Sequence, residues 1–346
     1  MMKIYADNAA TTKMSGVALE AMLPYMTEHY GNPSSLYTIG QEAKEGLEAA
    51  RAAVASCIGA QPREITFTSG GSEADNQAIR SAAVIGARKG KKHIISTKFE
   101  HHAVLHTLAK LEKEGFEVTL LDVHETGLVT AQEVKDAIRE DTCLVTIMFA
   151  NNEIGTIQPI AEIGKVCHEA GVLFHTDAVQ AAGHVAIDVN AMNIDMLSMS
   201  GHKFHGPKGV GALYIRPGLP LPPFIHGGGQ EGNFRSGTEN LPGICGFAAA
   251  CEETNAAADI AHMAQLRDLC REKLQQVPGL VLIGKQDAPH IVNLSLPGLR
   301  SQGIINCLQS DGIYVSAGSA CSKGHRSHVL EAMHLSPAVI DGSIRV

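Results

Sequence analysis

The feature that most constrains the fold is a repeated alternation of short apolar runs and helical patterns between about residues 60 and 215. Seven runs have the length and composition of strands: Ile65–Thr68, His93–Ser96, Val118–Leu121, Leu144–Met148, Val172–His175, Met196–Met199 and Gly211–Ile215. Amphipathic patterns separate most of them, for example over 131–139 and 160–170. This alternation predicts an α/β fold, with a mostly parallel sheet covered by helices on both faces.

The sequence that follows predicts a second, smaller α/β domain. A proline- and glycine-rich stretch over 217–237 is too long for a simple turn and is typical of a functional loop. A helical pattern covers about 243–276, and strand patterns return at 291–295 and 313–316. The chain stops at Ser343–Val346, which has the pattern of the first half of a strand, so we expect the smaller domain to be truncated.

Two segments have the spacing of a helix-start capping box, in which a hydroxyl residue precedes an acid by three positions. They are Ser72-x-x-Asp75 and Thr130-x-x-Glu133. We therefore expect both hydroxyl residues to cap helices.

Composition excludes several classes of protein. The chain has 346 residues, a formal net charge of −8 and no basic run, so nothing indicates nucleic-acid binding. No apolar run approaches the roughly 18–20 residues of a membrane helix. The first residues lack the apolar core of a signal peptide, which predicts a cytoplasmic protein. None of the eight cysteines forms a C-x-x-C pair, so we expect no metal site.

One chemically informative segment, Thr68–Glu73, leaves a strand, passes two glycines and opens a helix. The backbone N–H groups and the dipole at such a helix start favour an anion, typically a phosphate. A tight strand-to-helix turn without a ligand explains the segment equally well. The pattern matches neither nucleotide-binding glycine motif.

Two more segments follow strands. Asp177 lies at the carboxyl end of the predicted sheet, where ligands bind in open α/β folds. Its carboxylate could keep a heterocyclic nitrogen protonated, or simply cap a helix. In Glu100-His101-His102, either histidine could stack on a ring or transfer a proton near neutral pH. For His102 we prefer a plain surface position at a helix start.

A lysine and a cysteine complete the set of candidates. Lys203, in Ser200-Gly201-His202-Lys203, follows an apolar strand in a turn rich in glycine and histidine. Desolvation there would favour the neutral amine, which is nucleophilic toward a carbonyl carbon. Cys321 lies among small residues near Lys323 and His325, which favour the reactive thiolate. An incidental loop thiol is the alternative.

Together these motifs resemble the class V aminotransferase superfamily, and within it the cysteine desulfurases of the NifS/IscS type. The matching runs, in family order, are Tyr5–Thr12, Phe67–Gly70 with Glu73 and Asn76, Glu100–His101, Asn151–Gly155, Asp177–Gln180, Ser200–Gly211, Arg235–Asn240 and Gly318–Cys321. The resemblance covers almost the whole chain. It implies the type I fold of pyridoxal-phosphate (PLP) transferases, similar to aspartate aminotransferase, with a large domain built on a seven-stranded sheet. We place this large domain at 16–255, and the smaller one at 1–15 together with 256–346.

The resemblance also implies how PLP is bound. Lys203 would hold the cofactor as a Schiff base and act as the base at the substrate Cα. Asp177 would pair with the pyridine nitrogen, and His101 would stack on the ring and help with proton transfer. Gln180 would bond the ring hydroxyl, with Asn152 close to it and to the substrate.

Further positions would contact the phosphate and the neighbouring subunit. By resemblance, Gly71, Ser72, Ser200 and His202 would hold the phosphate. Thr238 is similar to a phosphate contact that the family receives from the partner subunit, which implies a homodimer with shared active sites.

The reaction implied is sulfur removal from L-cysteine. Arg345 would clamp the substrate carboxylate. Cys321 would take the sulfur as a persulfide, alanine would leave, and the sulfur would pass to an acceptor or iron–sulfur scaffold protein. Whether Cys321 is also a transient ligand of an iron–sulfur cluster stays open.

Two other functions are compatible with these residues. One is a different class V PLP enzyme, such as an aminotransferase or a selenocysteine lyase. The other is a scaffold or regulator that keeps the fold without catalysis. Cys321 favours the desulfurase over a transaminase, because transamination needs no loop thiol.

Overall fold

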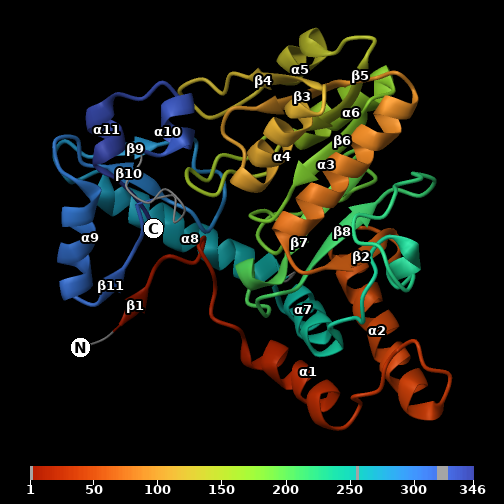
Figure 1. Cartoon of the computed structure of the whole chain (residues 1–346). Coiled ribbons are helices and arrows are strands. Elements are labelled where there is room, and N and C mark those ends of the chain that lie inside the picture. Colours follow the sequence, from red (N-terminus) through yellow and green to blue (C-terminus); the bar gives the residue numbers. More distant parts are fainter. Residues whose placement is uncertain (1–2, 255–256, 318–325) are drawn as a thin grey trace.

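The computed structural model describes residues 3–254, 257–317 and 326–346. A seven-stranded sheet of order β2-β8-β7-β6-β5-β3-β4 forms the centre of its larger part (Figure 1). The strands are β2 (Ile65–Thr68), β3 (His93–Thr97), β4 (Glu117–Leu121), β5 (Thr142–Thr146), β6 (Leu173–Asp177), β7 (Met196–Ser200) and β8 (Gly211–Ile215). Only β8 runs antiparallel to its neighbours in this sheet. The predicted mostly parallel α/β sheet is confirmed.

Helices cover both faces of this sheet, as the alternation of buried residues requires. Ile94 of β3 packs into the core beneath α3 and α4, whereas its neighbour Ile95 packs into the core beneath α2, α6 and α7. Leu144 and Val145 of β5 divide in the same way, since successive side chains of a strand point to opposite faces. The helices of this part are α1 (Gly16–Thr27), α2 (Thr38–Cys57), α3 (Gly71–Arg88), α4 (His102–Lys113), α5 (Ala131–Ala137), α6 (Ile160–Ala170) and α7 (Leu241–Thr254).

The C-terminal part carries a separate antiparallel sheet of order β12-β10-β9. Its elements are α8 (Ala257–Leu274), β9 (Val281–Ile283), β10 (Asn293–Ser295), α9 (Ser301–Ser310), β11 (Ile313–Tyr314), α10 (His328–Ala332), α11 (Pro337–Asp341) and β12 (Ser343–Arg345). The first strand, β1 (Ile4–Tyr5), pairs in parallel with β11, so the start of the chain joins this C-terminal part. Within the described ranges, no helix has both the length and the apolar character needed to cross a membrane.

The two predicted capping boxes differ in outcome. Thr130 and Glu133 cap α5 reciprocally, as predicted. The prediction for Ser72 and Asp75 is wrong, because α3 already begins at Gly71 and its N-cap is Gly70. Gly70 has a φ of 148°, which favours glycine at this close link between strand and helix.

The predicted positions of β5 and of the long helix also differ from the structure. The expected strand over 144–148 ends at Thr146, although the backbone N–H groups of Ile147 and Phe149 still donate hydrogen bonds to His175 and Asp177 of β6. The residues that follow Thr146 are buried in the core, which explains their apolar character. The helical pattern over 243–276 corresponds to two helices, α7 and α8.

Candidate active site

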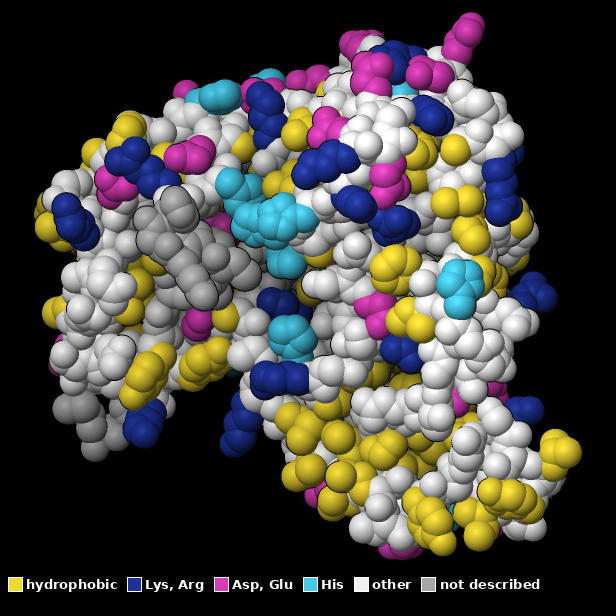
Figure 2. Space-filling view, in the orientation of Figure 1, with side chains coloured by type: hydrophobic (Ala, Val, Ile, Leu, Met, Phe, Trp, Pro, Cys, Tyr) yellow, Lys and Arg dark blue, Asp and Glu magenta, His cyan; other side chains and the backbone are white. Residues whose placement is uncertain are grey.

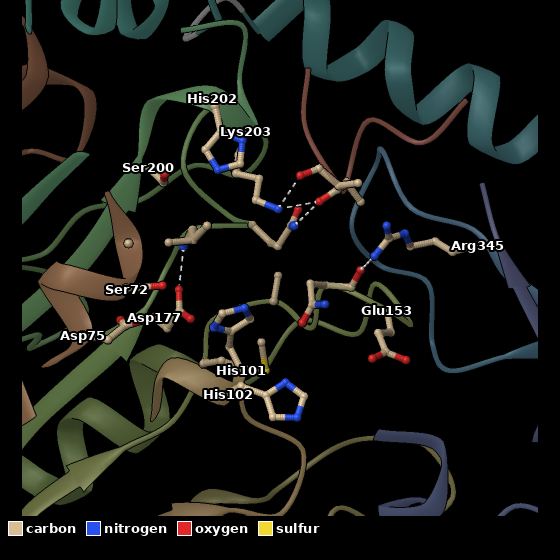
Figure 3. Close-up of a pocket in the computed structure, with 18 of the residues that line it drawn as sticks. Ser72, Asp75, His101, His102, Glu153, Asp177, Ser200, His202, Lys203 and Arg345 are labelled. Atoms are coloured by element: carbon tan, nitrogen blue, oxygen red, sulfur yellow. Dashed lines mark hydrogen bonds between the residues drawn. The ribbon is translucent and has the colours of Figure 1, made fainter. Parts of the chain in front are cut away.

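A cavity of about 270 Å³ lies at the carboxyl ends of the parallel strands, and residues from both parts of the chain line it. The predicted site residues that line it are Gly71, Ser72, His101, Asn152, Asp177, Gln180, Ser200, His202, Lys203 and Arg345. Figure 3 shows Lys203, His101, Asp177 and Arg345 pointing into this cavity from four separate segments. The fold therefore brings these predicted residues together although Gly71 and Arg345 are 274 positions apart.

Lys203 ends the short 3₁₀ helix Gly201–Lys203, which directly follows β7. Its Nζ donates hydrogen bonds to the carbonyl oxygens of Ala9 and Ala10, at 2.7 and 3.0 Å. The N-terminal segment thus holds the amine at the cavity wall through main-chain atoms. A lysine presented in this way is suited to bond covalently to a carbonyl carbon when it is neutral.

Asp177 is the last residue of β6 and is buried. Its Oδ1 accepts a hydrogen bond of 2.9 Å from the backbone N–H of Val179. Burial raises the pKa of this carboxyl, although His101 and Lys203 oppose the shift. A buried acid of this kind gains from a cationic partner, such as a protonated ring nitrogen, because the partner would compensate its charge.

His101 caps the start of α4 with its side chain. Its Nδ1 accepts a hydrogen bond of 3.1 Å from the backbone N–H of Ala103. This contact assigns the proton of the neutral ring to Nε2. The pKa of His101 is lowered, first by burial, so the ring is predominantly neutral near pH 7. A neutral imidazole is suited to stack on a flat ligand and to exchange a proton.

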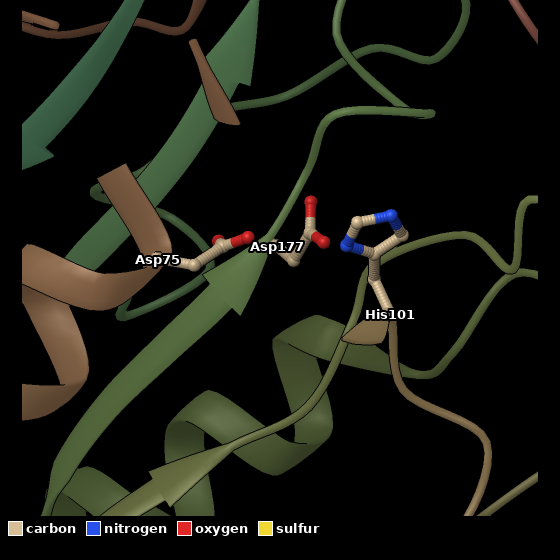
Figure 4. A group of neighbouring side chains, drawn as sticks. All are labelled: Asp75, His101 and Asp177. Atoms are coloured by element: carbon tan, nitrogen blue, oxygen red, sulfur yellow. The ribbon is translucent and has the colours of Figure 1, made fainter. Parts of the chain in front are cut away.

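Asp75, on α3, is a third member of this cluster. Each residue of the cluster offers one atom that could bind a metal ion, and these atoms of Asp75, His101 and Asp177 lie within 4.8 Å of one another. Asp177 lies between the other two residues (Figure 4). Such spacing also suits a metal ion, and the expectation of no metal stays a prediction. Burial and the charge of Asp177 raise the pKa of Asp75 well above its usual value. Two adjacent buried acids cannot both ionise without a cation between or beside them.

The start of α3 forms the other wall. A cavity of about 360 Å³ adjoins the first one, and Gly71, Ser72, Ser200 and His202 line both. A Cβ on Gly71 would lie 2.5 Å from Cγ2 of Val179, so this approach requires glycine. The first N–H groups of a helix have no acceptor within it and can bind an anion. The geometry and donor set fit a phosphate.

Arg345 lies in β12 and is 2% exposed. It donates hydrogen bonds of 2.7 Å to the carbonyl oxygen of Asn152 and of 2.7 Å to Oδ1 of Asp7. The guanidinium therefore lines the cavity but is held by an acid and a main-chain oxygen. A substrate carboxylate at this position would share Arg345 with Asp7, or displace it.

One predicted residue lies elsewhere in the described part of the chain. Thr238 lines a separate cavity of about 150 Å³ near Phe67 and Ser69. Within one chain, it is not brought to the site. Cys321, the predicted sulfur acceptor, lies outside the described residues, and its role stays a prediction.

Sequence reasoning missed Asp75 and the carbonyls of Ala9 and Ala10. The spacing from Ser72 to Asp75 was a signal, but it suggested a helix cap instead of a buried acid. Main-chain hydrogen-bond acceptors cannot be recognised from a pattern of side chains, because every residue has the same carbonyl group. The segment that contains them, Tyr5–Thr12, matched the family and was the available clue.

Comparisons with known proteins agree with this geometry. The family model "Aminotransferase class-V" matches residues 4–346. A "Cysteine desulfurase IscS" from Methanosarcina thermophila is 50% identical over 349 residues, covering 99% of this chain and 86% of the relative. One from Clostridium botulinum is 48% identical over 353 residues, covering 99% of this chain and 89% of the relative.

Solved structures give the same result. A "NifS-like protein" superposes with a TM-score of 0.92 at 39% identity, covering 100% of this chain and 93% of that one. The structure "SspA in complex with cysteine" superposes with a TM-score of 0.89 at 38% identity, covering 100% of this chain and 98% of that one. The chain therefore belongs to the class-V aminotransferase family and, within it, to the cysteine desulfurases.

Proposed function

We propose that this chain uses PLP to convert L-cysteine to L-alanine and leaves the sulfur as a persulfide on Cys321. The observation that carries this proposal is the convergence of Lys203, Asp177 and His101 on one cavity at the carboxyl edge of the sheet. Members of the family are generally PLP-dependent. The structural relative SspA was solved in complex with cysteine, which supports that substrate here.

The residues present fit PLP. Lys203 would hold its aldehyde carbon covalently, and Asp177 would face its ring nitrogen. The start of α3 with Ser72, Ser200 and His202 would hold its phosphate. When bound, the cofactor supplies an electron sink that stabilises negative charge at the substrate Cα.

The chain's own residues would then handle substrate and protons. Arg345 would bind the substrate carboxylate and so orient the Cα toward Lys203. The amine of Lys203 would take and return a proton at this carbon. His101 would exchange a proton through Nε2. Burial around these groups excludes competing water.

Cys321 would complete the reaction. Its thiolate sulfur bonds to the substrate sulfur while the Cβ–S bond breaks, and a proton on Cβ completes alanine. The described flanks of its segment support this role. Ser316 pairs with Arg345, and Ser327 donates a hydrogen bond to Glu153, so both flanks contact residues that line the cavity.

A second copy of the chain would complete the assembly. Several apolar side chains of α1, of the loop after it and of the start of α2 are exposed, and they gather at the lower end of the molecule in Figure 2. They include Val17, Leu19, Leu23, Met26, Leu36 and Ile39. An exposed apolar face of this kind is typical of an interface. We infer a homodimer in which Thr238 of each subunit serves the partner's phosphate site.

The remaining features of the proposal concern organisation and delivery. We propose a large domain at 16–255 and a smaller one formed by 1–15 and 256–346, and the pairing of β1 with β11 supports this division. We also propose a cytoplasmic enzyme that delivers sulfur to an acceptor or iron–sulfur scaffold protein. This acceptor would take the sulfur from Cys321.

Mass spectrometry of the intact protein after treatment with L-cysteine tests the proposal. We expect a gain of one sulfur, mapped to Cys321, together with release of alanine. Cys321→Ala should lose the added sulfur and most of the alanine formation. Undiminished turnover in that variant would contradict the persulfide step and favour another class V reaction. Sedimentation of the untreated protein tests the dimer.

A further inference from the structure

Two histidines, His184, which is buried, and His290, which is partly buried, stack against each other near the cavity residue Gln180. The ring centres of His184 and His290 are 3.6 Å apart, and the ring planes differ by 17°. His184 follows β6 by seven residues, whereas His290 lies in the turn before β10 of the C-terminal part. Neither histidine lines the cavity itself, so they act, if at all, through a neighbour.

That neighbour is Gln180, which does line the cavity. Its Nε2 donates a hydrogen bond of 2.7 Å to the carbonyl oxygen of Ala9, and its Oε1 lies 3.1 Å from Nε2 of His290. The carbonyl of Ala9 can only accept, so the NH₂ group of the amide must face it. Oε1 must then face His290, and since this oxygen can only accept, Nε2 of His290 carries the proton.

The same carbonyl also accepts the hydrogen bond from Lys203. If the Gln180 amide were reversed, its oxygen would face the carbonyl oxygen of Ala9, which Lys203 already holds in place. Neither oxygen has a proton to donate. Two contacts, from Ala9 and from His290, thus select one orientation of the amide. In this orientation Nε2 of Gln180 has a second N–H group, which can donate a hydrogen bond to an acceptor in the cavity.

Packing alone does not account for the histidine at position 290. The Nδ1 atoms of His184 and His290 are buried, and neither has a hydrogen-bond partner among the described residues. Burying an unpaired polar atom costs free energy, which an apolar ring of similar size would avoid. Burial lowers the pKa of both rings, to about 4 for His184, so both stay neutral near pH 7. Two neutral rings can stack without charge repulsion.

We infer that His290, with His184 stacked against it, is a positioning residue that fixes the amide of Gln180 so that the cavity receives a hydrogen-bond donor. The inference rests on the proposed function, in which an oxygen of the PLP ring accepts this bond. The stacked histidines add to that proposal, because they explain how the amide of Gln180 is kept from flipping. The amide then keeps the one orientation that donates a hydrogen bond to an anionic oxygen.

A double-mutant cycle on cofactor affinity tests the inference. Cofactor-stripped protein is titrated with PLP, with absorbance as the signal, for the wild type, His290→Phe, Gln180→Ala and the double variant. We expect each single change to weaken binding about five- to tenfold, the value of one hydrogen bond. The double variant should match Gln180→Ala, because His290 acts only through Gln180. Additive losses would overturn the inference.

Two matched variants separate positioning from packing. His184→Phe keeps a stacked ring and should leave the affinity for PLP close to that of the wild type. His290→Asn restores a side-chain N–H donor and should recover part of the lost affinity. Thermal unfolding of each cofactor-stripped variant shows whether the fold is intact. Equal losses for His184→Phe and His290→Phe would assign the pair to packing and contradict the inference.

Spectroscopy gives two further readouts. In the loaded protein, His290→Phe should raise the pH midpoint of the visible-absorption change, because a weaker donor leaves more negative charge on the ring oxygen. In the cofactor-stripped protein, ¹⁵N NMR should find the Nε2–H tautomer of His290 between about pH 6 and 8. An Nδ1–H tautomer would overturn the inference about His290 but would leave the proposed function intact. Absence of PLP binding by the wild type would overturn the proposed function as well.

Discussion

Arg345, in strand β12, donates a hydrogen bond of 2.7 Å to Asp7, which lies two residues after the end of strand β1. The two residues are 338 positions apart, yet both side chains meet at the cavity edge. Asp7 therefore holds the guanidinium of Arg345 in position. At the same time it occupies an N–H group that could otherwise bind a substrate carboxylate.

The first prediction concerns this pair. Arg345→Lys should raise the KM for L-cysteine by about tenfold or more, because an ammonium cannot bind a carboxylate through two parallel hydrogen bonds. The value of kcat should fall much less. Alanine release at varied L-cysteine concentrations measures both.

Asp7→Asn is the informative partner variant. It removes the competing carboxylate but leaves the guanidinium in place, so KM should stay the same or fall. A KM that is unchanged in Arg345→Lys would show that the substrate carboxylate binds elsewhere.

The second prediction distinguishes the two buried acids. Asp177→Asn should lower kcat roughly 100-fold or more, because a neutral amide cannot stabilise a protonated ring nitrogen. Asp75→Asn, the neighbouring buried carboxyl, should cause a much smaller loss. Alanine release, with PLP content measured on the same samples, provides the comparison. Similar losses in both variants would mean that the two acids act as one unit.

The third prediction concerns stability. Arg51 donates hydrogen bonds of 2.7 and 2.8 Å to the carboxylate of Glu231, and the backbone N–H of Phe67 donates a third, of 2.7 Å. Both charged side chains are buried. Glu231→Gln should lower the free energy of unfolding by about 3 kcal/mol, because it removes the buried counter-charge of Arg51 and leaves only the exposed Glu48, 3.5 Å away. Denaturant unfolding measures this change.

An exposed ion pair provides the control for that experiment. Asp341→Asn breaks the surface contact with Arg326 and should have a far smaller effect, since water solvates both groups. Equal effects of the two substitutions would contradict the importance of burial.

The fourth prediction concerns pH. Burial raises the pKa of Glu100 to about 8, despite hydrogen bonds from Thr97 and from the backbone N–H of Met148. The folded state then binds more protons than the unfolded state between about pH 4.5 and 8, so stability falls as pH rises through this window. Glu100→Gln mimics the protonated acid and should flatten this dependence by roughly 5 kcal/mol over the window. Unfolding at a series of pH values checks it; an unchanged slope would place the titration elsewhere.

Much of the fold and part of the site follow from local patterns. Strands such as β3 and β6 are short runs between helical patterns. Asp177 is the last residue of one strand, and Lys203 lies three residues after the end of another. Residues at the carboxyl ends of parallel strands converge on one edge, so their meeting was predictable. The end of β5 was not, because Ile147 and the residues after it are as buried and apolar as the strand that they follow.

Other features depend on contacts across long separations. His184 and His290 are more than a hundred residues apart and neither lies in a recognisable motif. Asp75 carries a local pattern that favours a different role. In each case, the tertiary structure decides which partner a side chain meets, and no short window of sequence contains that information.

The contact of Lys203 with the carbonyls of Ala9 and Ala10 has a consequence for mutagenesis. Every amino acid offers the same main-chain oxygen, so a loss caused by a larger side chain at Ala9, which is buried, would report packing and not the bond to the reactive amine. Saturation mutagenesis would therefore fail to identify the part of the site that consists of main-chain atoms. Only changes that move the segment, or that replace an amide bond itself, would expose it.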